Sequence, residues 1–206
     1  MEVIRSVELV RGKRKITFDS GWTVWLKQDD IPPFPLAEGT EVEKDSFEKF
    51  IMLRQYPLAL DRAVRMLAER PCSRKEIQRR LSSARFDGSV TDLVLYKLEK
   101  ENLLDDRDFA EQWVLSRSRK YGAVRIRAEL RMKGVDPETV ETVMDSCPEE
   151  EQKSCAVAFA AKKIKSLRDS CDPVRMKQRV LSALIRRGYT WDLASAAYEE
   201  AVQQQK

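Results

Sequence analysis

Residues 126–135, with the sequence Ile-Arg-Ala-Glu-Leu-Arg-Met-Lys-Gly-Val, decide the fold because a similar pattern occurs at two other places in the chain. In each stretch an apolar residue lies four positions, or one helical turn, before a leucine. A few residues after that leucine the helix is expected to end. The related stretches are 77–86 and 180–189, which gives offsets of 49 and then 54 residues. Repeats of this length are typical of stacked helical modules, because one three-helix unit buries little apolar surface and its neighbours complete the core.

Capping signals around these stretches predict where the helices begin and end. Ser73 and Glu76 form a capping box, whereas Asp136 and Asp172 each precede a proline at the first helical position. Thr190 is a further N-cap residue. Glycines at 134 and 188 lie where helices should stop. The expected helices are 46–56, 58–69, 74–84, 90–101, 107–120, 123–133, 137–145, 150–167, 173–187 and 191–203.

The first 45 residues differ from the rest of the chain. Runs of β-branched and aromatic residues near 3–10, 15–18 and 22–26 are separated by turn residues and predict a three-stranded meander. The fold class is therefore mainly α, with tandem three-helix repeats in three modules forming an elongated helical array, and with a small N-terminal β-meander. The expected division is a β-rich segment at 1–45, a connecting helix at 46–57, and three-helix modules at 58–104, 105–147 and 148–206.

Composition excludes several classes of function. The chain has 206 residues, of which 42% are hydrophobic and 35% charged, and this is typical of a soluble globular protein. We expect a cytoplasmic protein without contact to a membrane, because no apolar run could span a bilayer and no secretory signal begins the chain. The absence of histidine excludes Ser-His-Asp triads, Cys-His dyads and His-ligated zinc. We expect the four cysteines, which show no Cys-x-x-Cys spacing, to be buried, reduced thiols.

Acidic and aromatic clusters allow other chemistry, but each has a structural interpretation. Asp105, Asp106 and Asp108 could hold Mg²⁺, and would then support a carboxylate-dependent nuclease. Helix capping explains them better, so no metal, cofactor or catalytic residue is expected. Four aromatic residues could stack on bases, but their helical spacing favours the core. They are Phe109, Trp113, Trp191 and Tyr198.

Basic residues gather between the two helices expected at 107–120 and 123–133. The formal net charge of the chain is only +4, but the charges are segregated. The helix dipole favours cations at the end of a helix but not at its beginning, so it leaves part of this group unexplained. Two interpretations remain open. The group binds a partner, which is either a phosphate or an acidic protein, or it is an ordinary charged face without a partner. The candidate partner-binding or nucleic-acid-binding residues are Arg117, Arg119, Lys120, Arg125, Arg127 and Arg131.

A family resemblance rests on an ordered series of motifs in the same region. The series is Leu104-Asp-Asp-x-x-Phe-Ala110, then Arg117, then Tyr121-Gly-x-x-x-Ile-x-x-Glu-Leu-x-x-Lys-Gly-Val135. It resembles the RecX family, bacterial regulators of the RecA recombinase. The stretch from Ala63 to Leu81 is similar to the first repeat of that family, so the resemblance covers most of the chain.

The resemblance implies a regulatory protein that is not an enzyme. Such a protein would bind RecA and its filament on single-stranded DNA and inhibit the recombinase, ATPase and coprotease activities of RecA, which links it to DNA repair, recombination and the SOS response. Direct contact with DNA is possible, and a monomer is expected. The alternative is a helical-repeat adaptor that binds nucleic acid without a recombinase partner. In either case we place Phe109, Ile126 and Leu130 in the core.

Overall fold

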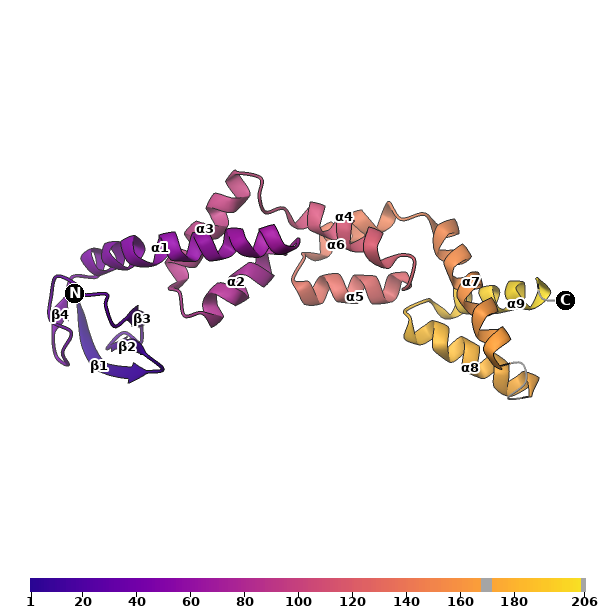
Figure 1. Cartoon of the computed structure of the whole chain (residues 1–206), viewed down its shortest axis with the longest axis horizontal. Coiled ribbons are helices and arrows are strands. Elements are labelled where there is room, and N and C mark those ends of the chain that lie inside the picture. Colours follow the sequence, from indigo (N-terminus) through magenta and orange to yellow (C-terminus); the bar gives the residue numbers. More distant parts are fainter. Residues whose placement is uncertain (168–171, 205–206) are drawn as a thin grey trace. The chain divides into compact units, whose positions relative to one another are not determined.

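The computed structural model describes residues 1–167 and 172–204, and the chain forms two compact units, Met1–Asp105 and Asp106–Lys206. The described residues form a small antiparallel sheet followed by nine helices, which confirms the expected mainly α fold with three-helix repeats (Figure 1). The division into five segments stays a prediction.

The N-terminal sheet has four strands in the order β3-β2-β1-β4. β1 (Glu2–Val10), β2 (Lys13–Phe18) and β3 (Thr23–Lys27) form the expected meander. β4 (Glu41–Val42) pairs with the start of β1 and was not predicted, because two residues give no readable alternation. Ile16, Phe18, Val24 and Leu26 alternate onto the face of the sheet that packs against the helices of the first unit.

The prediction of separate helices at 46–56 and 58–69 was wrong, because a single helix, α1 (Lys44–Glu69), runs through Pro57. The buried residues Ile51, Gln55, Ala59 and Ala63 continue at helical spacing across the proline. Pro57 itself is exposed, so the carbonyl group that loses its helical hydrogen bond lies on the side facing water. Two shorter helices complete the first unit: α2 (Arg74–Ser83) and α3 (Gly88–Lys100).

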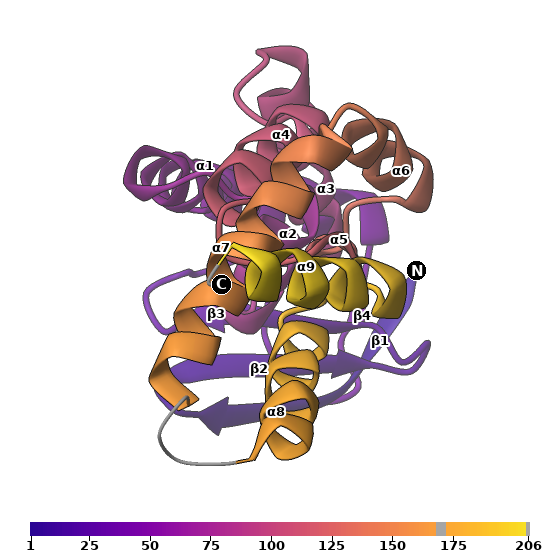
Figure 2. The same cartoon turned by 90° about the vertical axis from the view of Figure 1, so that its right-hand side faces the viewer.

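The second unit contains two three-helix groups, each with its own apolar cluster. The first group is α4 (Asp106–Arg117), α5 (Ala123–Lys133) and α6 (Pro137–Asp145). The second is α7 (Glu149–Leu167), α8 (Pro173–Arg186) and α9 (Trp191–Gln203), and Figures 1 and 2 show α9 crossing α7. The predicted caps Ser73, Asp136, Asp172 and Thr190 all accept backbone N–H groups at helix starts.

The two groups of the second unit meet through backbone atoms. The N–H of Gly122 donates to the carbonyl of Arg187 at 2.9 Å, and the N–H of Val124 donates to the carbonyl of Gly188 at 3.1 Å. A Cβ atom on Gly122 would lie 2.3 Å from the Gly188 carbonyl oxygen, so this approach requires glycine.

Burial confirms most of the predicted core. Phe109, Ile126, Leu130 and Tyr198 are buried, and Trp113 packs on the same cluster as Phe109. Trp191 is an exception: it is 62% exposed, because it is the first residue of α9 and lies beyond the buried face of that helix.

The cysteines fit the prediction only in part. Cys72 is buried, whereas Cys147 and Cys155 are half-buried. Burial raises the pKa of Cys155. Cys171 lies outside the described residues.

Candidate partner-binding surface

The six predicted residues lie at the junction of α4 and α5 and along α5. Arg117 ends α4, and its carbonyl accepts the N–H groups of Lys120 at 2.8 Å and Tyr121 at 3.0 Å. These bonds form the turn that carries Arg119 and Lys120. The other three, Arg125, Arg127 and Arg131, are residues of α5.

Glu129 on α5 binds cationic side chains from both helices. Its carboxylate lies 3.5 Å from Arg117 Nε and 2.9 Å from Arg125 Nε, and it also accepts the indole N–H of Trp113 at 3.2 Å. The carboxylate is largely covered, with a side-chain exposure of 15%. Arg117 and Arg125 are therefore held in defined positions rather than left mobile in water.

Aromatic rings also contact the basic side chains of this surface. The Arg117 guanidinium lies 4.5 Å from the centroid of the Trp113 ring, and that of Arg125 lies 4.0 Å from the centroid of Tyr121. Lys133 Nζ lies 4.3 Å from the Trp113 centroid. These cation–π contacts add to the ion pairs in fixing the basic side chains against the module.

Glu141 on α6 binds the other two arginines. Its Oε2 accepts Arg127 Nε at 2.8 Å, and its Oε1 accepts Arg131 Nη2 at 2.9 Å. The hydrogen bond from Arg127, followed by the charge of Arg127 and the interactions of Arg131, lowers the pKa of the Glu141 carboxyl. Both arginines thus connect α5 to α6 and contribute to the packing of the module.

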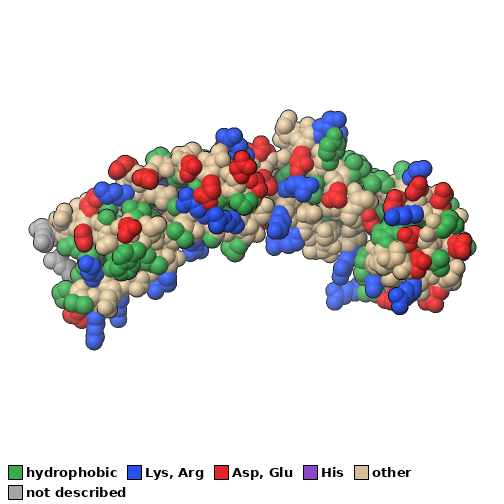
Figure 3. Space-filling model, turned by 180° about the vertical axis from the view of Figure 1, so that it is seen from behind, with side chains coloured by type: hydrophobic (Ala, Val, Ile, Leu, Met, Phe, Trp, Pro, Cys, Tyr) green, Lys and Arg blue, Asp and Glu red, His purple; other side chains and the backbone are tan. Residues whose placement is uncertain are grey.

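Arg119 and Lys120 differ from the other four residues. Both are exposed, and within residues 1–167 and 172–204 neither forms an ion pair. Four of the six cations share the carboxylates of Glu129 and Glu141, so the surface has an excess of positive charge, and the two cations of this turn contribute to it without an ion pair. Figure 3 shows one face of the molecule, on which basic and acidic side chains are interspersed over much of the surface.

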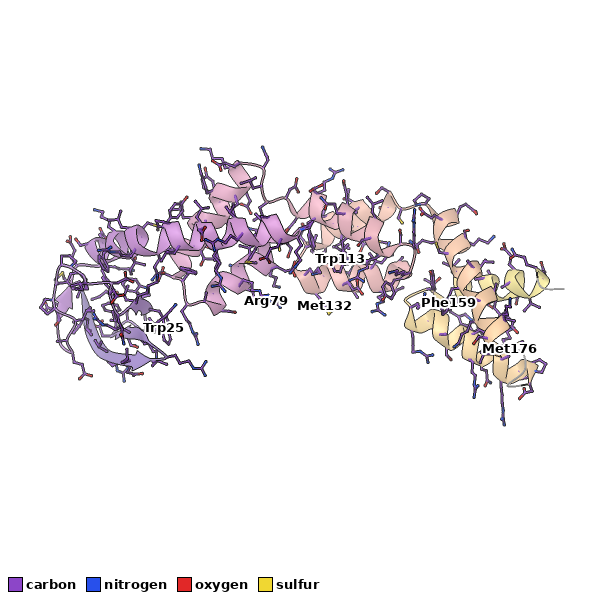
Figure 4. All side chains as sticks on the ribbon, in the orientation of Figure 1. Trp25, Arg79, Trp113, Met132, Phe159 and Met176 are labelled. Atoms are coloured by element: carbon purple, nitrogen blue, oxygen red, sulfur yellow. The ribbon has the colours of Figure 1, made fainter. Side chains whose placement is uncertain are left out.

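Apolar side chains on α5 lie beside these cations, and our sequence reasoning missed them. Val124 and Met132 are 53% and 76% exposed, and Ala128 between them is also exposed (Met132 is labelled in Figure 4). Their spacing of i, i+4 and i+8 places them on one helix face, and this spacing was readable in the sequence. A face with both apolar and basic side chains suits a protein partner as well as a phosphate.

The acidic residues at the start of α4 act as part of that helix. Asp106 and Asp108 lie in its first turn, where the dipole favours them, and Asp108 accepts the side-chain amide of Gln112 at 2.8 Å. Among the residues described, no group of three or more Asp, Glu, Cys or His side chains could hold a metal ion. No described helix combines the length and apolar character needed to cross a membrane.

Comparison with known proteins identifies the family. The family model "RecX, second three-helix domain" matches residues 105–144, which include all six candidate residues. Regulatory protein RecX of Corynebacterium efficiens is 35% identical over 152 residues, which cover 69% of this chain and 72% of that protein. RecX of Chlorobaculum tepidum is 33% identical over 136 residues, which cover 65% of this chain and 82% of the relative.

Solved structures share the fold. A crystal structure of regulatory protein RecX superposes with a TM-score of 0.66 at 21% identity, and it covers 97% of this chain and 100% of its own. The crystal structure of RecX from Lactobacillus salivarius gives a TM-score of 0.67 at 19% identity over 73% of this chain and 99% of its own. From the sequence relatives together with this fold, we conclude that the chain belongs to the RecX family of regulatory proteins.

Proposed function

We propose that this protein regulates RecA by binding RecA and its filament on single-stranded DNA, and that it inhibits the recombinase, ATPase and coprotease activities of RecA. Membership of the RecX family supports the partner, because that family regulates RecA. In this reading the protein modulates DNA repair, recombination and the SOS response in the cytoplasm, and it acts as a monomer without catalysis.

The basic turn between α4 and α5 is the part of the surface that we assign to the filament. The observation that carries this assignment is the difference in pairing between the six cations. Four of them are bound to Glu129 or Glu141, whereas Arg119 and Lys120 are exposed and form no ion pair within the described residues. An unpaired cation can bind an anion without first losing a partner. Arg119 and Lys120 therefore provide the direct contacts, and the four paired arginines support them.

This pairing determines which substitutions test the function. Reversing Arg125, Arg127 or Arg131 would place two carboxylates side by side at Glu129 or Glu141, and loss of activity could then follow from loss of structure. The double variant Arg119→Glu, Lys120→Glu breaks no ion pair of the described residues. A matched control is Lys162→Glu, Lys165→Glu on α7, which makes the same change of charge at two exposed lysines of the same unit.

The test is ATP hydrolysis by preformed RecA filaments on single-stranded DNA, at two salt concentrations. Wild-type protein and the α7 control should inhibit at ratios well below one per RecA. The Arg119, Lys120 variant should require at least about tenfold more protein, because like charges then face the partner. Equal inhibition by both variants would remove the assignment of this surface.

The same assay distinguishes the adaptor that acts without RecA. An adaptor would inhibit only when enough protein is present to cover the DNA. Inhibition at low ratios favours a regulator of the filament.

A further inference from the structure

A cavity of about 330 Å³ in the first unit has a strongly basic lining. It lies where strands β2 and β3, helix α1 and the segment after α2 come together, and Trp25 of β3, labelled in Figure 4, forms part of its wall. Its two acidic residues are Asp30 and Asp61. The basic residues of the lining are Lys13, Lys27, Arg54, Arg62, Arg65 and Arg85.

The acidic residues of the cavity leave most of this positive charge unpaired. Asp61 pairs with Arg65 at 3.0 Å, and Asp30 accepts the backbone N–H of Lys27 at 2.9 Å. Within residues 1–167 and 172–204, Lys27, Arg62 and Arg85 form no ion pair. Lys13 donates to the carbonyl of Ala84 at 2.8 Å instead of to a carboxylate.

The cations are close enough to affect one another. Burial lowers the pKa of Lys13, and the positive charges of Lys27, Arg62 and Arg85 lower it further. A bound anion would offset this mutual repulsion.

Arg85 has a backbone conformation that disfavours any residue with a Cβ atom. Its φ is +68°, and it follows the end of α2 in a left-handed turn, with the N–H of Phe86 donating to the carbonyl of Leu81 at 3.2 Å. The corresponding positions of the other two modules are Gly134 and Gly188, with φ of +85° and +87°. Arginine is less favourable in this conformation than the glycine of the other two modules, which is consistent with a role for its side chain.

The side chain of Arg85 contacts an aromatic ring in the wall of the cavity. Its guanidinium lies 4.8 Å from the centroid of the Trp25 ring, and Arg85 itself is exposed at the cavity. Proteins that bind single strands combine cations for the phosphates with aromatic rings or guanidinium planes on which bases stack. The pair formed by Arg85 and Trp25 offers such a plane beside the unpaired cations.

We propose that this cavity binds a phosphate group of single-stranded DNA, with Arg62, Arg85 and Lys13 around the phosphate and with a neighbouring base against Arg85. The site belongs to the first unit, whereas the surface proposed for the filament belongs to the second. Its test needs no RecA, so the outcome is separate from that of the proposed function.

The first experiment compares two arginine-to-glycine variants of the full chain. Arg85→Gly removes the cation, and it also relieves the strain that a residue with a Cβ atom has in the left-handed conformation. The control, Arg11→Gly, removes a cation that also has positive φ, at +50°, in the turn between β1 and β2, and Arg11 does not line the cavity. Both variants should melt at or above the wild-type temperature, since glycine accepts this conformation readily.

Binding is measured by the fluorescence anisotropy of labelled oligo(dT) over a range of salt concentrations. Arg85→Gly should weaken binding about tenfold and reduce the salt dependence by about one phosphate contact, whereas Arg11→Gly should change little. Equal affinities of the two variants would overturn the proposal.

Two further measurements test for a structural role and for another ligand. Arg62→Gln on α1 changes an exposed side chain with no ion pair in the described part of the chain, so it should weaken oligo(dT) binding without lowering the melting temperature. If only Arg85→Gly weakens binding and it also melts lower, Arg85 merely holds the sheet to α2. Displacement of oligo(dT) by an equal concentration of ATP would show that the cavity takes a free nucleotide, and would overturn the assignment to a strand.

Discussion

Replacing Gly122 with alanine should weaken the junction between the two helix groups of the second unit. Gly122 has φ of −79°, which alanine adopts freely, so the effect of the substitution is steric. The added Cβ would lie 2.3 Å from the carbonyl oxygen of Gly188 and 2.5 Å from the backbone nitrogen of Tyr189. Backbone atoms cannot rotate away as the end of a side chain can, so the two groups must move apart.

The magnitude follows from the bonds that this movement breaks. The hydrogen bonds from Gly122 to Arg187 and from Val124 to Gly188 both connect the groups, and each stabilises by about 0.5–1.5 kcal/mol. We therefore expect the free energy of unfolding of the second unit to fall by about 1–3 kcal/mol.

The assay is urea unfolding combined with hydrogen exchange of the Gly122 and Val124 amides. Gly88→Ala is the matched control, because a Cβ on Gly88 meets nothing within 4 Å, and it should be neutral or stabilising. If Gly122→Ala is as stable as the control and both amides remain protected, the reasoning about this junction is refuted.

Two predictions concern stability elsewhere in the second unit. Leu130→Ala should lower the free energy of unfolding by about 2–5 kcal/mol in urea denaturation, because Leu130 is fully buried in the cluster of α4, α5 and α6, whereas a neutral result would contradict that burial. Hydrogen bonds with the side chain and backbone of Thr139 lower the pKa of the Asp136 carboxyl. The ionised carboxyl therefore stabilises the folded state above its unfolded pKa, and this stabilisation is lost as the pH falls through the folded pKa. Asp136→Ala should therefore make the melting temperature less dependent on pH below about pH 4, and an unchanged pH profile would contradict this.

The sequence predicted the parts of the fold that local chemistry controls. The caps at Ser73, Asp136 and Thr190 were readable because each is a short-range contact between a side chain and the next turn of backbone. Helix α1 could not be predicted as one helix, because its continuity through Pro57 depends on which side of the helix faces the core. The strand β4 depends in the same way on a partner that is distant in the sequence.

The six basic residues of the candidate surface were selected from the sequence, but the sequence did not show which of them form ion pairs. The ion pair of Arg125 with Glu129 has a spacing of i, i+4 and could have been predicted. The pairs of Arg127 and Arg131 with Glu141 cross from α5 to α6, so only the packing of the two helices reveals them. For this reason the sequence could not separate Arg119 and Lys120 from the four paired arginines.

One position of the repeat illustrates how similar modules acquire different roles. One or two residues after the second helix of each module, the chain has a residue with a left-handed backbone, and this residue is Arg85, Gly134 or Gly188. At Gly188 the missing side chain allows the backbone of the neighbouring group to approach, since a Cβ there would lie 2.3 Å from the Cβ of Arg125. At Arg85 the side chain instead contacts Trp25 and lines a basic cavity. The left-handed turn follows the second helix in all three modules, and the residue within it has different consequences at two of them: Gly188 allows a neighbouring backbone to approach, whereas Arg85 presents a cation.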